Sequence, residues 1–218
     1  IEEATHIFVI GVIVYYDPTF LITDDVDDPL PNAQVYITWR NGTTDALPRY
    51  TSSDGLINLT RVSAGNYGFT ILWKDVVVGQ TTVYVDSDDL YTIKTQVYQL
   101  TVQVYGNTGG SIHGAYVIVN TQSGIGQGLG TTDETGKALF KLPSGTYIIS
   151  VHYTTTYWLT VVRTSVNEQV SVTASTSENI VLTGYPPAIW STTLFLLMMG
   201  MVVAVVTVIL IIFMKRRA

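Results

Sequence analysis

Hydrophobic and polar residues alternate in short runs along most of the chain between residues 7 and 183. The runs 101–105, 115–119, 147–151 and 169–173 place an apolar residue at every second position, and turn residues such as Ser144 and Gly145 separate such runs. A period of two residues, rich in β-branched and aromatic side chains, is typical of strands with one buried face. The pattern predicts an all-β fold built from antiparallel, Ig-like β-sandwiches.

The same region contains an internal repeat. Segments 31–37, 51–55 and 63–67 align in order with 113–119, 132–136 and 143–147, at nearly constant offsets of 82, 81 and 80 residues. Three ordered matches at one spacing indicate two copies of a single structural unit. We therefore predict two tandem sandwiches, over residues 1–97 and 98–183.

The second copy carries a distinctive motif at Thr132, Asp133, Gly136, Leu142, Pro143, Gly145 and Tyr147. This motif resembles that of the carboxypeptidase-regulatory-like, or prealbumin-like, β-sandwich family. The first copy matches loosely, with Asp54-Gly55 displaced and Ser63 in place of a proline. The resemblance covers about 180 of the 218 residues, and it implies a module used in stalks, spacers, adhesive domains and accessory subunits.

Each copy places a tyrosine two positions after a glycine, at Tyr67 and Tyr147. A glycine can adopt the positive φ of a tight connection, and a strand with alternating inward side chains follows it. We expect both tyrosines to pack at a corner of their sandwich.

A different pattern begins at Leu194, where 21 residues through Met214 contain no charge, proline or asparagine. A helix of this length spans about 30 Å, the thickness of the hydrocarbon core of a bilayer. The run predicts a transmembrane helix over 194–214, after a juxtamembrane segment at 184–193 and before a basic tail at 215–218. Gly200 and Ala204 have the spacing of a small-residue helix contact.

The residues around this helix predict its orientation. Trp190 suits the interfacial aromatic belt, and Lys215, Arg216 and Arg217 place the C-terminus in the cytoplasm. Residues 1–193 carry 17 acidic and 8 basic side chains, a net charge of −9. Because the chain begins with isoleucine, we expect a signal peptide to have been removed. These features predict a single-pass, type I protein of the cell membrane with an extracellular N-terminal region.

Composition excludes several functional classes. The chain has no cysteine, so it has no disulfide, zinc-thiolate site or cysteine nucleophile. The acidic charge balance argues against a nucleic-acid partner, which requires clusters of basic side chains. A cysteine-free outer region rich in valine, isoleucine, tyrosine and threonine resembles the cell-surface proteins of heat-loving archaea.

The candidate sites are few, and none has the pattern of a catalytic site or a cofactor site. Asp24, Asp25, Asp27 and Asp28 supply closely spaced oxygens of the kind that calcium prefers, although no complete calcium-loop motif is present. The rival interpretation is a solvated acidic loop. Further candidates are the glycosylation sequons at Asn41 and Asn58 and an aromatic contact cluster of Tyr153, Tyr157 and Trp158.

These observations favour a non-catalytic, membrane-anchored envelope protein whose repeats serve as a stalk or as an adhesive or protein-interaction module. Its expected partners are the lipid bilayer and at least one envelope or membrane protein, and a homo-oligomer remains open. One alternative is an accessory structural subunit of a respiratory or transport complex. Another is a carbohydrate- or calcium-binding surface domain.

Overall fold

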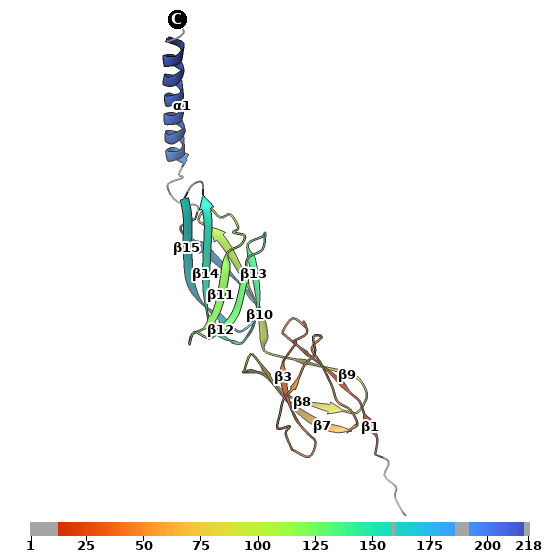
Figure 1. Ribbon diagram of the computed structural model, residues 1–218. Coiled ribbons are helices and arrows are strands. Elements are labelled where there is room, and N and C mark those ends of the chain that lie inside the picture. Colours follow the sequence, from red (N-terminus) through yellow and green to blue (C-terminus); the bar gives the residue numbers. More distant parts are fainter. Residues whose placement is uncertain (1–12, 158–159, 186–191, 216–218) are drawn as a thin grey trace, which may run out of the picture.

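The computed structural model describes residues 13–157, 160–185 and 192–215. This part of the chain is all-β and sandwich-like, apart from one C-terminal helix (Figure 1). The first unit comprises β1 (Tyr15–Tyr16), β2 (Thr19–Thr23), β3 (Gln34–Thr38), β4 (Arg49–Tyr50), β5 (Leu56–Asn58), β6 (Val62–Ser63), β7 (Gly65–Trp73), β8 (Val76–Val85) and β9 (Leu90–Lys94). The second unit comprises β10 (Val97–Gly106), β11 (Tyr116–Thr121), β12 (Gly126–Thr131), β13 (Lys137–Pro143), β14 (Gly145–Tyr157), β15 (Thr160–Val172) and β16 (Thr176–Leu182).

The two units pair their strands in the same order. The first unit has sheets of order β5-β2-β9 and β4-β3-β7-β8, and the second has β13-β10-β16 and β12-β11-β14-β15. The first unit also has a two-stranded pairing of β1 with β6. In each unit the central strand of the three-stranded sheet is antiparallel to one neighbour and parallel to the other, so that β2 lies parallel to β9 and β10 parallel to β16. The two copies inferred from the sequence therefore share one topology.

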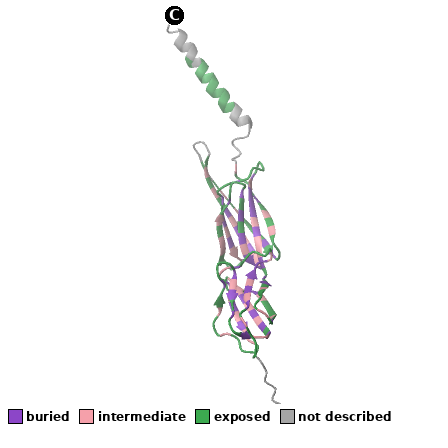
Figure 2. Ribbon diagram, turned by 90° about the vertical axis from the view of Figure 1, so that its right-hand side faces the viewer, coloured by how far each residue is buried: buried purple, intermediate pink, exposed green. Residues whose placement is uncertain are grey.

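Each unit has its own hydrophobic core. Buried and exposed residues alternate along the strands of both units, as the period of two predicts (Figure 2). The core of the first unit includes Phe20, Phe69 and Ile71, and that of the second includes Leu142 and Ile149. The two clusters comprise different residues.

A buried threonine occupies the same place in both units. Thr51 Oγ1 donates to the carbonyl oxygen of Leu30 at 2.6 Å and accepts from the amide of Ala33 at 2.8 Å. Thr132 makes the two equivalent bonds in the second unit, at 2.6 and 2.9 Å. These bonds satisfy backbone groups at the start of β3 and β11, which would otherwise be buried without partners.

The predicted corner tyrosines are confirmed, although of the two glycines before them only Gly65 has a positive φ, at +155°. The Tyr67 hydroxyl donates to the carbonyl oxygen of Ser63, and the Tyr147 hydroxyl donates to that of Pro143, each at 2.7 Å. Both side chains are almost fully buried, and burial raises the pKa of Tyr147, so its hydroxyl stays protonated as a donor. Each bond closes the connection that leads into the long inner strand of its unit.

We expect Tyr147→Phe to lower the free energy of unfolding by about 1–2 kcal/mol, because the buried carbonyl of Pro143 loses its donor. Tyr116→Phe is the control, since Tyr116 is 43% exposed. It should change the free energy of unfolding by less than about 0.5 kcal/mol. Urea unfolding followed by tyrosine and tryptophan fluorescence measures both variants, and equal effects would contradict a structural role for this hydroxyl.

The C-terminal helix, α1 (Thr192–Lys215), extends away from the end of the second unit (Figure 1). Its described side chains, Leu197 to Thr207 and Ile209, are exposed. Within the part of the chain that the structure describes, no helix meets the length and hydropathy required to cross a bilayer. The structure therefore does not support the transmembrane span predicted over 194–214.

Candidate functional site

The best-defined polar cluster of the molecule lies where the two units meet. Strand β10, the first strand of the second unit, connects the two units, because Val97 at its start is buried in the first core and Leu100 in the second. Backbone bonds bind the neighbouring loops to this crossing point. The amide of Asp25 donates to the carbonyl oxygen of Val97 at 3.0 Å, and the amide of Ser144 donates to that of Gln96 at 3.1 Å. We call this contact region the joint.

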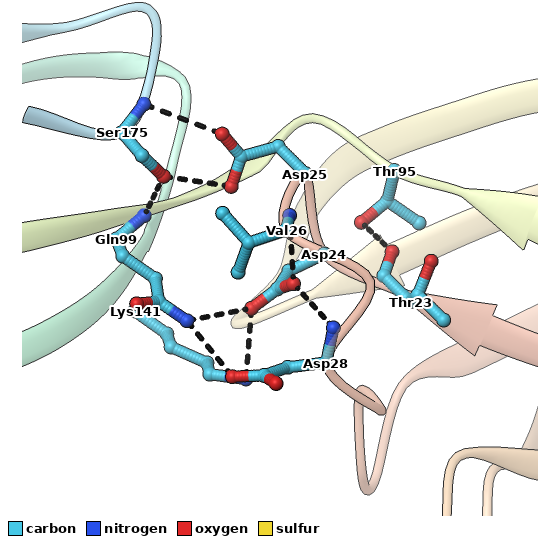
Figure 3. Close-up of polar contacts among 9 residues, drawn as sticks. All are labelled: Thr23, Asp24, Asp25, Val26, Asp28, Thr95, Gln99, Lys141 and Ser175. Atoms are coloured by element: carbon cyan, nitrogen blue, oxygen red, sulfur yellow. Dashed lines mark hydrogen bonds and ion pairs between the residues drawn. The ribbon is translucent and has the colours of Figure 1, made fainter.

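Asp24 lies at the centre of the joint (Figure 3). It follows β2 directly, and its side chain is fully buried. Its Oδ1 accepts bonds from the amides of Val26 at 3.1 Å and Asp28 at 2.9 Å, within its own loop. Its Oδ2 faces the second unit, 2.8 Å from Lys141 Nζ and 3.4 Å from Gln99 Nε2. The buried carboxylate is thus bonded on one side by its own loop and on the other by the second unit.

Lys141 and Gln99 reach Asp24 together because they are paired residues on adjacent strands, β13 and β10. Both also contact Asp28 Oδ2, which lies 3.2 Å from Lys141 Nζ and 2.8 Å from Gln99 Nε2. Burial alone would lower the pKa of Lys141, but hydrogen bonds and Coulomb attraction from Asp24 and Asp28 outweigh it and raise that pKa. The ammonium group is therefore charged at neutral pH.

A second bridge crosses the joint beside the first. Ser175, in the turn between β15 and β16, donates its hydroxyl to Asp25 Oδ1 at 2.8 Å and its amide to Asp25 Oδ2 at 3.3 Å. The same hydroxyl oxygen accepts the amide of Gln99 at 2.8 Å. Figure 3 shows both bridges converging from the second unit on the loop after β2.

A third contact comes from the turn between β7 and β8. Lys74 Nζ donates to the carbonyl oxygens of Gln127 and Lys141 in the second unit, the latter at 3.2 Å, and lies 4.5 Å from the centre of the Trp73 ring. Burial lowers the pKa of Lys74. The joint is thus held from two sides of the first unit.

The structure gives the predicted aspartate cluster roles other than metal binding. Asp24, Asp25 and Asp28 bond to the second unit, whereas Asp27 forms an exposed ion pair with Lys94 at 2.8 Å. Among the described residues, no group of three or more histidine, aspartate or glutamate side chains is arranged to hold a metal ion. The calcium hypothesis therefore gains no support from this loop.

Sequence reasoning missed the partners of these aspartates. Lys141, Gln99 and Ser175 lie far from residues 24–28 in the chain, and the strands that carry Lys141 and Gln99 have ordinary alternating patterns. A repeat or a motif predicts contacts within one unit, but it does not predict contacts between units.

The other predicted site residues are spread over the molecule. Asn41 and Asn58 are both exposed, and Asn41 Oδ1 accepts bonds from the amide and hydroxyl of Thr43. Tyr153 is half-buried and packs edge-on against Tyr185, with ring centres 5.2 Å apart.

The remaining predicted residues lie in or beside α1. Gly200 and Ala204 lie on the helix, and a Cβ added to Gly200 would meet nothing within 4 Å. Lys215 is the last residue of the helix. The side chain of Tyr157 and the residues Trp158, Trp190, Arg216 and Arg217 lie outside the described part of the chain.

Comparison with known proteins finds similarity at the level of architecture. No protein-family model matches the chain, including any for the carboxypeptidase-regulatory-like family, and no curated protein matches it.

Three solved structures illustrate the likeness. The TIE protein of Bacillus anthracis is 16% identical over 77% of this chain, with a TM-score of 0.33, and this chain spans only 33% of it. BcpA, the major pilin subunit of Bacillus cereus, is 8% identical over 78% of this chain and 99% of its own, with a TM-score of 0.34. A shaft pilin of Lactobacillus rhamnosus GG is 13% identical over 78% of this chain and 98% of its own, with a TM-score of 0.37. Two of these three solved structures are described as pilins.

Proposed function

We propose that this protein is a non-catalytic, membrane-anchored envelope protein whose two sandwiches form a stiff spacer between the membrane and a distal contact surface. The single observation that carries the proposal is the joint. A fully buried carboxylate of one unit is neutralised by a lysine of the other, and this contact fixes the direction in which the units are joined.

The placement of the ends supports a spacer. The first unit and α1 lie at opposite ends of the second unit (Figure 1). The apolar run 194–214, followed by three basic residues, is the candidate anchor, with its C-terminus in the cytoplasm. In this arrangement the first unit is held outward from the bilayer, and the joint limits how far it can tilt.

A distance measurement in vesicles tests the proposal. The chain lacks cysteine, so Asn66→Cys and His113→Cys each give a single labelling site at an exposed position. Asn66 lies at the start of β7, remote from the joint, whereas His113 precedes β11 in the half of the second unit toward α1. We expect energy transfer to a lipid-borne acceptor to be strong from position 113 and near background from position 66.

Two results would overturn the proposal. If the full chain does not float with the vesicles, there is no anchor. If both positions transfer energy equally, the sandwiches lie on the membrane and do not project from it.

An accessory subunit is the second candidate, because the Gly200 and Ala204 face of α1 is open in the described structure. Extraction of native membranes in a mild detergent, followed by sizing and mass spectrometry, separates the two candidates. A stoichiometric partner that is lost on Gly200→Leu would favour the subunit, and elution of the chain alone or as a homo-oligomer would favour the free-standing spacer.

A further inference from the structure

A cavity of about 460 Å³ opens in the first unit at the end remote from the joint. Its position follows from the strand directions. The turn after β7 contacts the second unit through Lys74, so the start of β7 and the end of β3 lie at the opposite end. The cavity is lined there by β1, by the segment after β3 and by the chain from residue 60 into β7. The lining residues that matter below are Tyr15, Trp39, Arg40, Asn41, Thr60, Arg61 and Tyr67.

Two arginines give this cavity a positive charge. Arg40 and Arg61 are exposed, and neither forms an ion pair with a carboxylate within the described residues, whereas Arg49, Lys94 and Lys141 do. The region before residue 194 has a net charge of −9, so two unpaired guanidinium groups in one cavity contrast with their surroundings. Guanidinium groups bind carboxylates through paired hydrogen bonds.

The positions of both arginines are restrained. A Cβ on Gly65 would lie 2.8 Å from Arg40 Cδ, so the glycine provides the space in which the Arg40 side chain lies. Arg61 lies 5.7 Å from the centre of the Tyr15 ring, and its amide donates to Asp17 Oδ1 at 2.6 Å. Restraint of this kind reduces the entropy lost when a ligand binds.

Aromatic rings form the apolar walls. Trp39 and Tyr67 pack edge to face with ring centres 5.9 Å apart, and Tyr67 is held by its bond to Ser63. The Trp39 indole donates to Asp45 Oδ1 at 2.5 Å, which fixes its ring. Tyr15 is 51% exposed, and its ring remains accessible to a ligand.

We propose that this cavity binds an acidic saccharide, a sugar ring that carries a carboxylate. The carboxylate pairs with Arg40 and Arg61, and the apolar face of the sugar ring packs on the exposed ring of Tyr15, beside Trp39. The polar side chains of Thr60 and Asn41 lie where hydroxyl groups of the sugar can bond to them. The volume is within the range of small-ligand sites and matches one or two sugar rings. The proposal goes beyond the spacer function, and it depends on neither the joint nor the helix.

Isothermal titration calorimetry on the purified full chain in detergent tests this site. The probes are digalacturonic acid and N-acetylneuraminic acid, with galactobiose as the neutral counterpart and a short poly-glutamate peptide as the alternative anion. We expect at least one acidic sugar to bind ten or more times more tightly than galactobiose. Its affinity should fall as the salt concentration rises, because exposed charges are screened.

Variants locate the binding. Arg40→Gln and Arg61→Gln should each weaken binding of the acidic sugar at least tenfold. Arg163 is an exposed arginine on β15 of the second unit, so Arg163→Gln should leave the affinity unchanged. All three side chains are exposed, so each variant should melt within a few degrees of the parent, and this melting confirms folding in the same samples.

The proposal is overturned if no acidic sugar binds, if galactobiose binds equally well, if only the peptide binds, or if Arg163→Gln weakens binding as much as the cavity variants. Because the protein is in detergent, none of these outcomes depends on whether the chain is a membrane-anchored spacer.

Discussion

Lys141→Met is expected to destabilise the protein by about 3 kcal/mol at pH 7, because it leaves the fully buried carboxylate of Asp24 without its counter-ion. Methionine keeps most of the length of the side chain, so the loss reports the charge and not a cavity. Calorimetric melting of the full chain measures the effect. Between labels at positions 66 and 113, an electron-spin distance measurement should give a narrow distribution in the parent and a broader one in the variant.

The matched control is Lys94→Met, which removes an ion pair that joins the same aspartate loop but is exposed on both sides, at 51% and 69%. Exposed pairs contribute about 0–1 kcal/mol, so this variant should melt close to the parent. The double variant Asp24→Asn with Lys141→Met should recover part of the loss, because an amide oxygen can still accept the two loop amides. Equal melting of the two lysine variants would show that the joint draws no stability from the buried pair.

The same pair has a defined pH dependence. The pKa of Lys141 is raised above its ordinary value of 10.5 in the folded protein. A raised basic pKa contributes stability that is complete below the unfolded value and is lost as the pH rises through the folded value. The difference in stability between the parent and Lys141→Met should therefore be constant from pH 6 to pH 9 and should shrink only above about 10.5.

Gly55→Ala should have the second large effect and lower the free energy of unfolding by about 3 kcal/mol or more. Gly55 has φ of +72°, and an added Cβ would lie 2.7 Å from the carbonyl oxygen of Ile22 and 3.0 Å from the amide nitrogen of Leu30. Both contacts are with backbone that also bonds across the turn, since Ile22 N–H donates to the Gly55 carbonyl oxygen at 2.9 Å. Neither side can move without breaking the connection between β2 and β5.

Gly42→Ala separates the clash from the backbone strain. Gly42 has a similar φ of +83°, but nothing lies within 4 Å of its added Cβ. Gly42→Ala should therefore lower the free energy of unfolding by only about 1–2 kcal/mol, the cost of the left-handed conformation itself. Chemical denaturation of both variants measures the difference, and a Gly55→Ala variant no less stable than Gly42→Ala would show that the turn can relax.

Much of the architecture could be predicted because it depends on local patterns in the sequence. The alternation of residues 101–105 and 147–151 gave the strands, and the three aligned segments gave a repeat whose two copies share one strand order. The corner tyrosines were predictable because glycine and tyrosine are only two positions apart. Repetition made the prediction robust, since each unit supports the interpretation of the other.

The joint and the cavity could not be predicted for the same physical reason. Asp24 and Lys141 are 117 positions apart and belong to different units, so no periodicity links them. From the sequence, the aspartates are either a candidate calcium site or a solvated acidic loop, because their closest neighbours in sequence are other aspartates. In the fold their closest partners are basic or polar. Likewise, Tyr15 and Tyr67 meet at the cavity only because β1 pairs with β6.

The parallel pairing within each unit has a mechanical consequence. In the second unit, tension enters at the start of β10, at the joint, and leaves at the end of β16, toward α1. Because β10 and β16 run parallel over seven paired residues from Leu100 with Thr176 to Gly106 with Leu182, such tension slides the strands past one another. All the hydrogen bonds of the ladder are then loaded together and not opened one at a time. The first unit repeats this geometry with β2 and β9 over five pairs, so a pull along the chain meets two shear-resistant elements in series.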